Sequence, residues 1–200
     1  MRTLLAIGSL LALASCGAAS ETSSEPRPEA SSGGGDEASQ PGEPLAELPF
    51  AAQVIRDATP AGRTYVFRFE EDGAQRFERW VFERVDERGF TSTSTPVDED
   101  GQPSGPVERA ESTWDELESH AHFPAARTTI TNAQLTIPLG AFRCRLYTVT
   151  SEDEQGREVV SRYWFAVDLP GAPVRMVREV DGEPVLTMMI VAHEPPLGGR

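Results

Sequence analysis

The chain has 200 residues, a formal net charge of −14 and 25% charged residues, and every basic residue is arginine. This length allows one ordinary domain with accessory segments. So acidic a chain disfavours nucleic acid and anionic lipid as direct electrostatic partners, because both are negatively charged.

The N-terminus has the pattern of a secretory signal. A positive start at Arg2 precedes an almost uncharged apolar run over residues 3–14, which is too short to span a bilayer as an anchor. The run ends in Leu13-Ala14-Ser15-Cys16, which resembles the lipobox of bacterial lipoproteins residue by residue. The resemblance implies that residues 1–15 form a lipoprotein signal peptide and that Cys16 carries diacylglycerol and an acylated amine. An ordinary signal peptide with a chance cysteine is the alternative.

The residues after Cys16 predict an envelope location. In enteric lipoproteins an Asp after the lipidated Cys retains the protein at the inner membrane, whereas Gly17 and Ala18 follow here. The resemblance therefore implies a lipid-anchored protein that faces the periplasm, and it favours the outer membrane over the inner one. Several acyl chains together anchor a protein stably.

Residues 16–47 are predicted to be a disordered acidic tether. The segment is rich in Ser, Gly, Glu, Pro and Ala, contains no aromatic residue and has Leu45 as its single large aliphatic side chain. Such a composition cannot bury enough apolar surface to offset the entropy of ordering the chain.

Residues 48–200 are predicted to form a single β-rich domain, because most of this segment reads as strands bounded by turns. The dipeptide Asp181-Gly182 predicts a hairpin turn, and the apolar stretch 185–191 predicts a central strand buried on both faces. The segment 89–95 is Thr-rich and is expected to be exposed. We expect strands at residues 65–70, 76–85, 89–95, 107–112, 128–131, 134–137, 141–150, 158–167, 174–180 and 183–192.

One short helix is predicted between the strands. Thr113 and Glu116 fit a capping box, and Trp114, Leu117 and Ala121 share one helical face. Pro124 sets the limit of this helix. The fold class is therefore mainly β, an antiparallel curved sheet or half-barrel with one short inserted helix, in which curvature or closure avoids long exposed edges.

The residues that could perform chemistry are few. His120 and His122 are two apart and chelate a metal poorly from a helix, and zinc needs three or four ligands. Cys144 lies in a predicted strand on the same apolar face as Phe142 and Leu146, so we expect an inert core thiol. We predict no catalytic, metal or cofactor site and no enzyme activity, and a metal-dependent hydrolase built on the two histidines is the remote alternative.

Aromatic residues are the more informative feature, because in a curved sheet they either pack a solid core or line a cavity for an apolar ligand. Under the second interpretation, the helix would cap the cavity. The possible ligand-facing residues are Tyr65, Phe67, Phe69, Trp80, Phe82, Trp114, Leu117 and Trp164.

The order of tether, sheet, mid-chain helix and further sheet resembles the half-barrel periplasmic proteins of the LolA, LolB and LppX kind. The resemblance implies a sheet that wraps an apolar moiety beneath a helical lid. The segments 120–124, 140–144 and 164–174 are also similar to uncharacterised secreted β-rich domains, which implies a shared fold alone. We therefore expect a membrane-tethered, non-enzymatic domain that binds an apolar ligand or an envelope protein. A structural or assembly lipoprotein with a solid core is the alternative.

Overall fold

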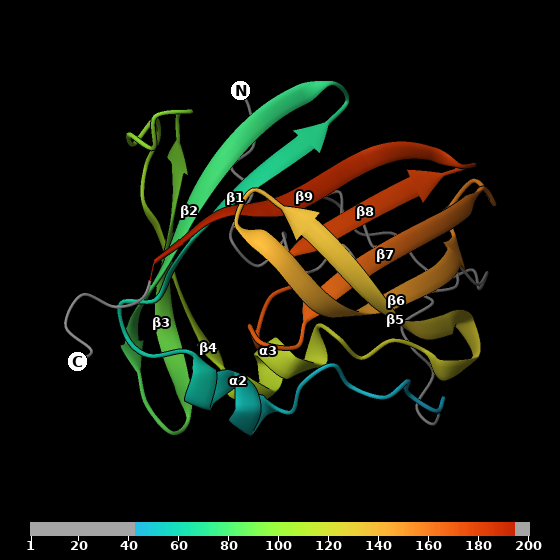
Figure 1. Ribbon diagram of the computed structural model, residues 1–200, viewed down its shortest axis with the longest axis horizontal. Coiled ribbons are helices and arrows are strands. Elements are labelled where there is room, and N and C mark those ends of the chain that lie inside the picture. Colours follow the sequence, from blue (N-terminus) through green and yellow to red (C-terminus); the bar gives the residue numbers. More distant parts are fainter. Residues whose placement is uncertain (1–42, 195–200) are drawn as a thin grey trace, which may run out of the picture.

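The computed structural model describes residues 43–194, so the predicted signal peptide, Cys16 and residues 16–42 of the predicted tether lie outside the described residues. The described chain forms a nine-stranded antiparallel sheet in the order β4-β3-β2-β1-β9-β8-β7-β6-β5 (Figure 1). This confirms the predicted antiparallel curved sheet. The strands are β1 Thr64–Glu71, β2 Ala74–Val85, β3 Gly89–Val97, β4 Glu108–Thr113, β5 Thr128–Ile137, β6 Gly140–Glu152, β7 Glu158–Ala166, β8 Arg175–Val180 and β9 Glu183–Glu194.

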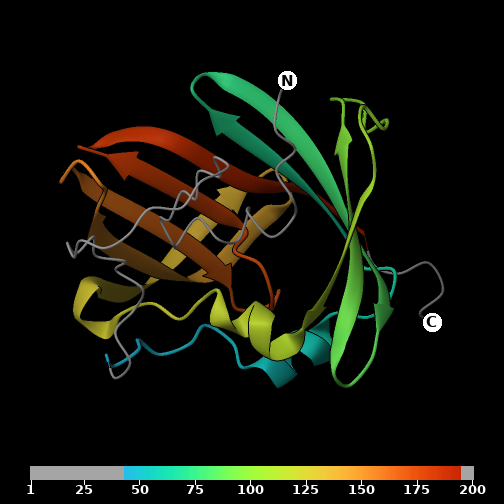
Figure 2. The ribbon, with the colours of Figure 1, turned by 180° about the vertical axis from the view of Figure 1, so that it is seen from behind.

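The pairing of β1 with β9 joins two antiparallel meanders into one sheet. Strands β1–β4 and β5–β9 form two arms that diverge from this central pair, as Figures 1 and 2 show. The β1–β9 register shifts between Val66 and Phe67. Strand β9 is the fifth of nine, and the consecutive residues Met188, Met189 and Ile190 are all buried. This agrees with the predicted central strand, because side chains of consecutive strand residues point to opposite faces.

Two short helices lie at one end of the arms, α2 Ala52–Ala58 and α3 Trp114–Ser119 (Figures 1 and 2). The capping box of α3 is present. The Thr113 hydroxyl accepts from the Glu116 N–H at 3.1 Å, and the Glu116 carboxylate accepts from the Thr113 N–H at 2.7 Å. No helix in residues 43–194 combines the length and the apolar character needed to cross a membrane.

The second half of the predicted helix is a turn rather than a continuation of α3. The helix stops at Ser119, before the limit at Pro124, and a short 3-10 helix, η2 Ala125–Arg127, follows the proline. Both Ala121 and Phe123 are buried in a cluster with Tyr147 and Phe165. A straight helix would direct Ala121 and Phe123 to different faces, so the turn allows both to reach the sheet.

Strand β3 corrects one expectation, because its Thr-rich stretch is buried and not exposed. The buried residues are Thr91, Ser92, Thr93, Ser94 and Thr95. Long side chains from the flanking strands cover this inner strand. Arg84 of β2 donates to the Thr91 hydroxyl at 3.1 Å and pairs with Glu111 of β4 at 3.0 Å, and Arg109 of β4 pairs with Glu83 of β2 at 2.6 Å.

Strand β5 is one continuous strand where two short strands were expected. Its ten residues pair with β6 without a register shift from Thr128 opposite Val149 to Ile137 opposite Gly140. Asn132, which separates the two expected strands, pairs with Arg145. The ladder to β6 therefore outweighs the low intrinsic strand preference of this residue.

The chain contacts the domain from Pro44 onward, four residues before the expected domain start at Leu48. The Pro44 carbonyl accepts from the Ala125 N–H, and the Ala46 N–H donates to the Phe123 carbonyl, both at 2.8 Å. The Tyr147 hydroxyl donates to the Glu47 carbonyl at 2.9 Å. These bonds fix the segment that leads into α2.

Candidate functional site

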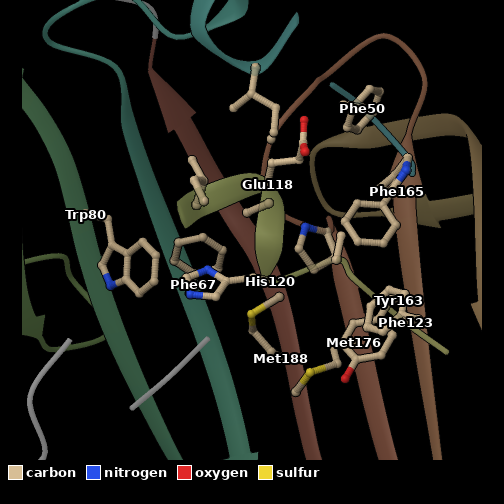
Figure 3. A pocket seen from close by; sticks show the side chains of 17 residues that line it. Phe50, Phe67, Trp80, Glu118, His120, Phe123, Tyr163, Phe165, Met176 and Met188 are labelled. Atoms are coloured by element: carbon tan, nitrogen blue, oxygen red, sulfur yellow. The ribbon is translucent and has the colours of Figure 1, made fainter. Parts of the chain in front are cut away.

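An apolar pocket lies between the sheet and the segment formed by α2, α3 and the turn after α3. Its volume is about 70 Å³. Figure 3 shows labelled side chains from both arms of the sheet, such as Trp80 and Phe165, converging around α3 and His120. The lining residues are Pro49, Phe50, Ile55, Phe67, Trp80, Leu117, Glu118, His120, Ala121, Phe123, Tyr163, Phe165, Gly171, Ala172, Pro173, Met176 and Met188.

The register of the sheet places the wall of the pocket on one face. Met176 of β8 lies directly opposite Met188 of β9 and Tyr163 of β7, and directly opposed residues of antiparallel strands share a face. The β1–β2 arm contributes Phe67 and Trp80, whose ring centroids are 4.9 Å apart. The pocket therefore depends on the β1–β9 pairing that joins the two meanders.

Aromatic contacts anchor the α3 segment to both arms. At its start, Trp114 packs on Phe90 of β3 with ring centroids 4.9 Å apart, and its Nε1 donates to the Asp86 carbonyl at 2.9 Å. At its end, Phe123 stacks on Tyr163 of β7 at 4.9 Å. Leu117 and Ala121 lie between these two anchors and face the pocket.

Two polar side chains reach the pocket from α3 and its C-cap. The Nδ1 atom of His120 is buried and has no hydrogen-bond partner within the described chain. Burial lowers the pKa of His120 below its usual 6.5, against a smaller opposing effect of Glu116, so the imidazole is neutral near pH 7. Glu118 is already engaged, because its Oε2 accepts from the Ala52 N–H at 2.6 Å and its Oε1 lies 3.6 Å from Nε2 of His122. The pocket thus offers an apolar wall and one unused imidazole nitrogen.

The volume limits what the pocket holds in this conformation. Sites for whole small molecules occupy roughly 300–1,000 Å³, and one water takes about 30 Å³ of the liquid. At about 70 Å³, the pocket accepts the end of an apolar chain or a small apolar side chain. A larger ligand would require the α3 segment to move away from the sheet.

The structure brings three of the eight possible ligand-facing residues to this pocket, namely Phe67, Trp80 and Leu117. The remaining residues occupy other places. Tyr65, Phe69, Phe82 and Trp114 are between 1% and 7% exposed and pack with neighbouring core residues.

Trp164 lies on the other face of the sheet, because it alternates with the pocket residues Tyr163 and Phe165 along β7. It sits opposite Arg175 of β8, whose guanidinium lies 5.3 Å from the indole centroid. The sequence did not single out several residues that complete the pocket: Phe50, Ile55, Phe123, Met176 and Met188. Their periodicity resembles that of ordinary core residues, so no local signal distinguishes them.

The candidate chemical residues do not converge. Within residues 43–194, no group of three or more His, Cys, Asp or Glu side chains is arranged to hold a metal ion. His122 is exposed, and its Nε2 lies 3.6 Å from the Oε1 of Glu118. Cys144 is 2% exposed in β6, and burial raises the pKa of its thiol.

No protein-family model and no curated protein sequence matches the chain. Among solved structures, the chain is similar to the complex of Pseudomonas aeruginosa MucA and MucB, with a TM-score of 0.48, 10% identity, and coverage of 71% of this chain and 54% of that chain. It is similar to a crystal structure of MucB, with a TM-score of 0.49, 10% identity and coverage of 71% and 56%. It is also similar to MucB in complex with MucA(peri), with a TM-score of 0.48, 10% identity and coverage of 72% and 53%. The chain spans about half the length of these structures, and similarity at this level supports no functional assignment.

Proposed function

We propose that this protein is a lipid-anchored, non-enzymatic binding protein of the bacterial cell envelope. Cys16 carries the lipid, and the segment after it tethers the domain. The pocket between α3 and the sheet receives an apolar group from a small ligand or from an envelope protein. The lipobox pattern Leu13-Ala14-Ser15-Cys16 supports the anchor. The pocket supports the binding role.

The observation that carries the binding role is an apolar cavity between aromatic and methionine side chains at the junction of the two arms. An unfilled apolar cavity costs about 24 cal/mol per Å³ in mutational series. An apolar group that fills the space recovers much of this free energy, and the unpartnered Nδ1 of His120 can form a hydrogen bond with a polar atom at the end of that group.

A structural lipoprotein with a solid core remains the second candidate, and a specific observation favours it. Tyr65, Phe67 and Phe69 are only 1–3% exposed, and the ring of Phe67 lies 6.0 Å from that of Tyr65 and 6.1 Å from that of Phe69. Under this candidate the cavity of about 70 Å³ is a packing defect that binds nothing.

A pocket-filling variant distinguishes the two candidates. Ala172 lines the pocket from the loop before β8, whereas Ala125 is exposed in η2. The full-length protein with Ala172→Leu should lose binding of the small apolar probe xenon, measured by xenon NMR, by about tenfold or more, since the added side chain occupies the cavity. Ala125→Leu is the matched control and should bind the probe as the unchanged protein does. Absence of saturable probe binding by the unchanged protein would favour the solid core.

The source of the apolar group follows from native mass spectrometry of the full-length protein released from membranes. A retained small apolar adduct, absent from Ala172→Leu, assigns the pocket to a small ligand. A retained polypeptide that Ala172→Leu loses assigns it to an envelope protein.

The anchor has its own test. Cys16→Ser should move the protein from the membrane fraction to the soluble periplasmic fraction and remove the mass of the acyl chains. Unchanged membrane retention in Cys16→Ser would contradict lipid anchoring at this residue.

A further inference from the structure

The two open edges of the sheet differ in how they are protected. Natural edge strands are commonly short, charged or covered, which prevents unwanted pairing with other chains. Strand β4 follows this rule. It has six residues, Glu108, Arg109 and Glu111 among them carry charge, and it runs directly into α3.

Strand β5 does not follow this rule. It is ten residues long, contains no charged residue and no proline, and pairs with β6 alone in the described chain. Every second residue of such a strand directs its N–H and C=O away from the sheet. The exposed residues along it are Thr129, Thr131, Asn132, Gln134 and Thr136. Among residues 43–194 no strand pairs with the outer edge of β5, which can therefore act as a template for an added strand.

The segment that contains β5 and most of β6 has a charge opposite to that of the chain as a whole. Residues 119–151 contain three arginines, Arg127, Arg143 and Arg145, and no acidic residue, in a chain that has 32 acidic residues. Arg143 lies opposite Gln134 in the ladder, and Arg145 lies opposite Asn132.

Each of the two β6 arginines already pairs with a carboxylate, and a carboxylate of a bound segment could join or replace that contact. Arg143 pairs with Asp168 at 3.3 Å, with the two side chains 73% and 68% exposed. Arg145 pairs with Glu47 at 2.8 Å, and the Glu47 side chain is 74% exposed. The exposed Arg143 pair contributes little to stability, about 0–1 kcal/mol, so it exchanges readily. The Arg145 side chain is only 25% exposed, so its carboxylate partner, rather than the arginine itself, is the part open to exchange.

We propose that the edge of β5 binds an extended acidic segment of a partner protein by strand addition. Such a strand would lie about 10 Å from β6, which is two strand spacings. In the structure Arg143 turns toward Asp168, which follows β7, and Arg145 toward Glu47 and the Leu48 carbonyl. An arginine side chain that leaves these partners is long enough to cross much of the separation. Since these arginines lie opposite Gln134 and Asn132, carboxylates at alternate positions of the added strand would face them. A second copy of this chain is a poorer occupant, because each copy has a net charge of −14.

The test uses the full-length protein and two ten-residue peptides with capped ends, one alternating Glu with Val and one alternating Lys with Val. The Glu peptide should bind at least about fivefold more tightly than the Lys peptide at low salt, with affinity falling as salt rises. Hydrogen exchange should show new protection at the alternate, outward-directed amides of residues 128–137 and none at residues 108–113. Equal binding of the two peptides, or binding without protection of β5, would overturn the proposal.

Variants assign the effect to named residues. Arg143→Gln combined with Arg145→Gln should weaken binding of the Glu peptide by about fivefold, whereas Arg109→Gln on the other edge strand should leave it unchanged. Arg145 also donates to the Leu48 carbonyl at 3.2 Å, so Gln134→Glu provides an independent variant at an exposed position. It should weaken binding of the Glu peptide through like-charge repulsion. Self-association that rises with salt and disappears in Gln134→Glu would assign the edge to a second copy and overturn the proposal.

Discussion

The carboxylate of Glu118 accepts a hydrogen bond from the backbone N–H of Ala52 at 2.6 Å, so a side chain of α3 caps the N-terminus of α2. The N-cap residue of α2, Ala51, has no side-chain oxygen to do this. The helix has seven residues and buries Ile55 alone. Since a helix this short is not stable by itself, its position depends on α3.

Replacing Glu118 should therefore loosen α2 before it affects the sheet. Glu118→Ala removes the cap and should lower the free energy of unfolding by about 1 kcal/mol. Hydrogen exchange should accelerate most at residues 52–58. Glu118→Gln should restore part of the protection, because its amide oxygen can still accept the bond, and Glu99→Ala in an exposed loop should change nothing. Unaltered exchange of α2 in Glu118→Ala would show that the cap does not hold this helix.

Trp114 should be the main anchor of the α3 segment to the β1–β4 arm. Its side chain is 4% exposed, packs on Phe90 and donates to the Asp86 carbonyl. Trp114→Ala should cost about 3–5 kcal/mol in the free energy of unfolding measured by denaturant titration. Trp114→Phe loses the hydrogen bond and should cost about 1–2 kcal/mol.

The control for Trp114 is Val107→Ala, which truncates an apolar side chain that is 63% exposed. It should shift the free energy of unfolding by no more than about 0.5 kcal/mol. An equally small effect of Trp114→Ala would show that α3 is held by its other contacts.

Local patterns predicted the elements whose structure depends on near neighbours. The capping box at Thr113 and Glu116 and the hairpin at Asp181-Gly182 both formed, and Asp181 and Gly182 have φ angles of 50° and 83°. These signals are local because a cap or a turn is satisfied within four residues. The antiparallel class followed from the same strands and turns.

The pocket could be predicted only in part, because it depends on contacts between distant segments. The pairing of β1 with β9 joins residues more than a hundred positions apart, and no periodicity encodes such a partner. Helix α2 was not predicted, because its N-cap hydrogen bond comes from Glu118, which is 66 residues away in the sequence. Phe67, Trp80 and Leu117 were identified as possible lining residues because they are large and apolar, and the same reasoning included Phe69 and Phe82, which are packed in the core.

Cys144 should behave as an unreactive thiol in the folded protein. It is 2% exposed, and burial raises the pKa of the thiol, so little thiolate is present at neutral pH. In a Cys16→Ser background, where Cys144 is the single cysteine, a colorimetric disulfide reagent should react at least about a hundredfold more slowly with native than with urea-unfolded protein. Rapid reaction of the native protein would reveal an open path to β6.

Two histidines should make the fold less stable in mild acid. Burial lowers the pKa of His120 and of His193 below 6.5, and the nearby Arg63 lowers that of His193 further. Because the folded state holds these protons less tightly than the unfolded state, the stabilising contribution is complete above pH 6.5 and declines as the pH falls through the folded pKa values. The free energy of unfolding, measured by urea titration, should therefore be lower at pH 5.5 than at pH 7.5.

Single variants identify the residues responsible for this acid sensitivity. His120→Gln and His193→Gln should each reduce the difference between pH 5.5 and pH 7.5, whereas His122→Gln, at an exposed side chain, should preserve it. Three carboxylates have lowered pKa values, Asp86, Glu116 and Asp153. They titrate below pH 4.5, so they do not account for a difference in stability between pH 5.5 and pH 7.5. Equal stability at the two pH values would show that the folded protein accommodates both imidazolium groups without loss.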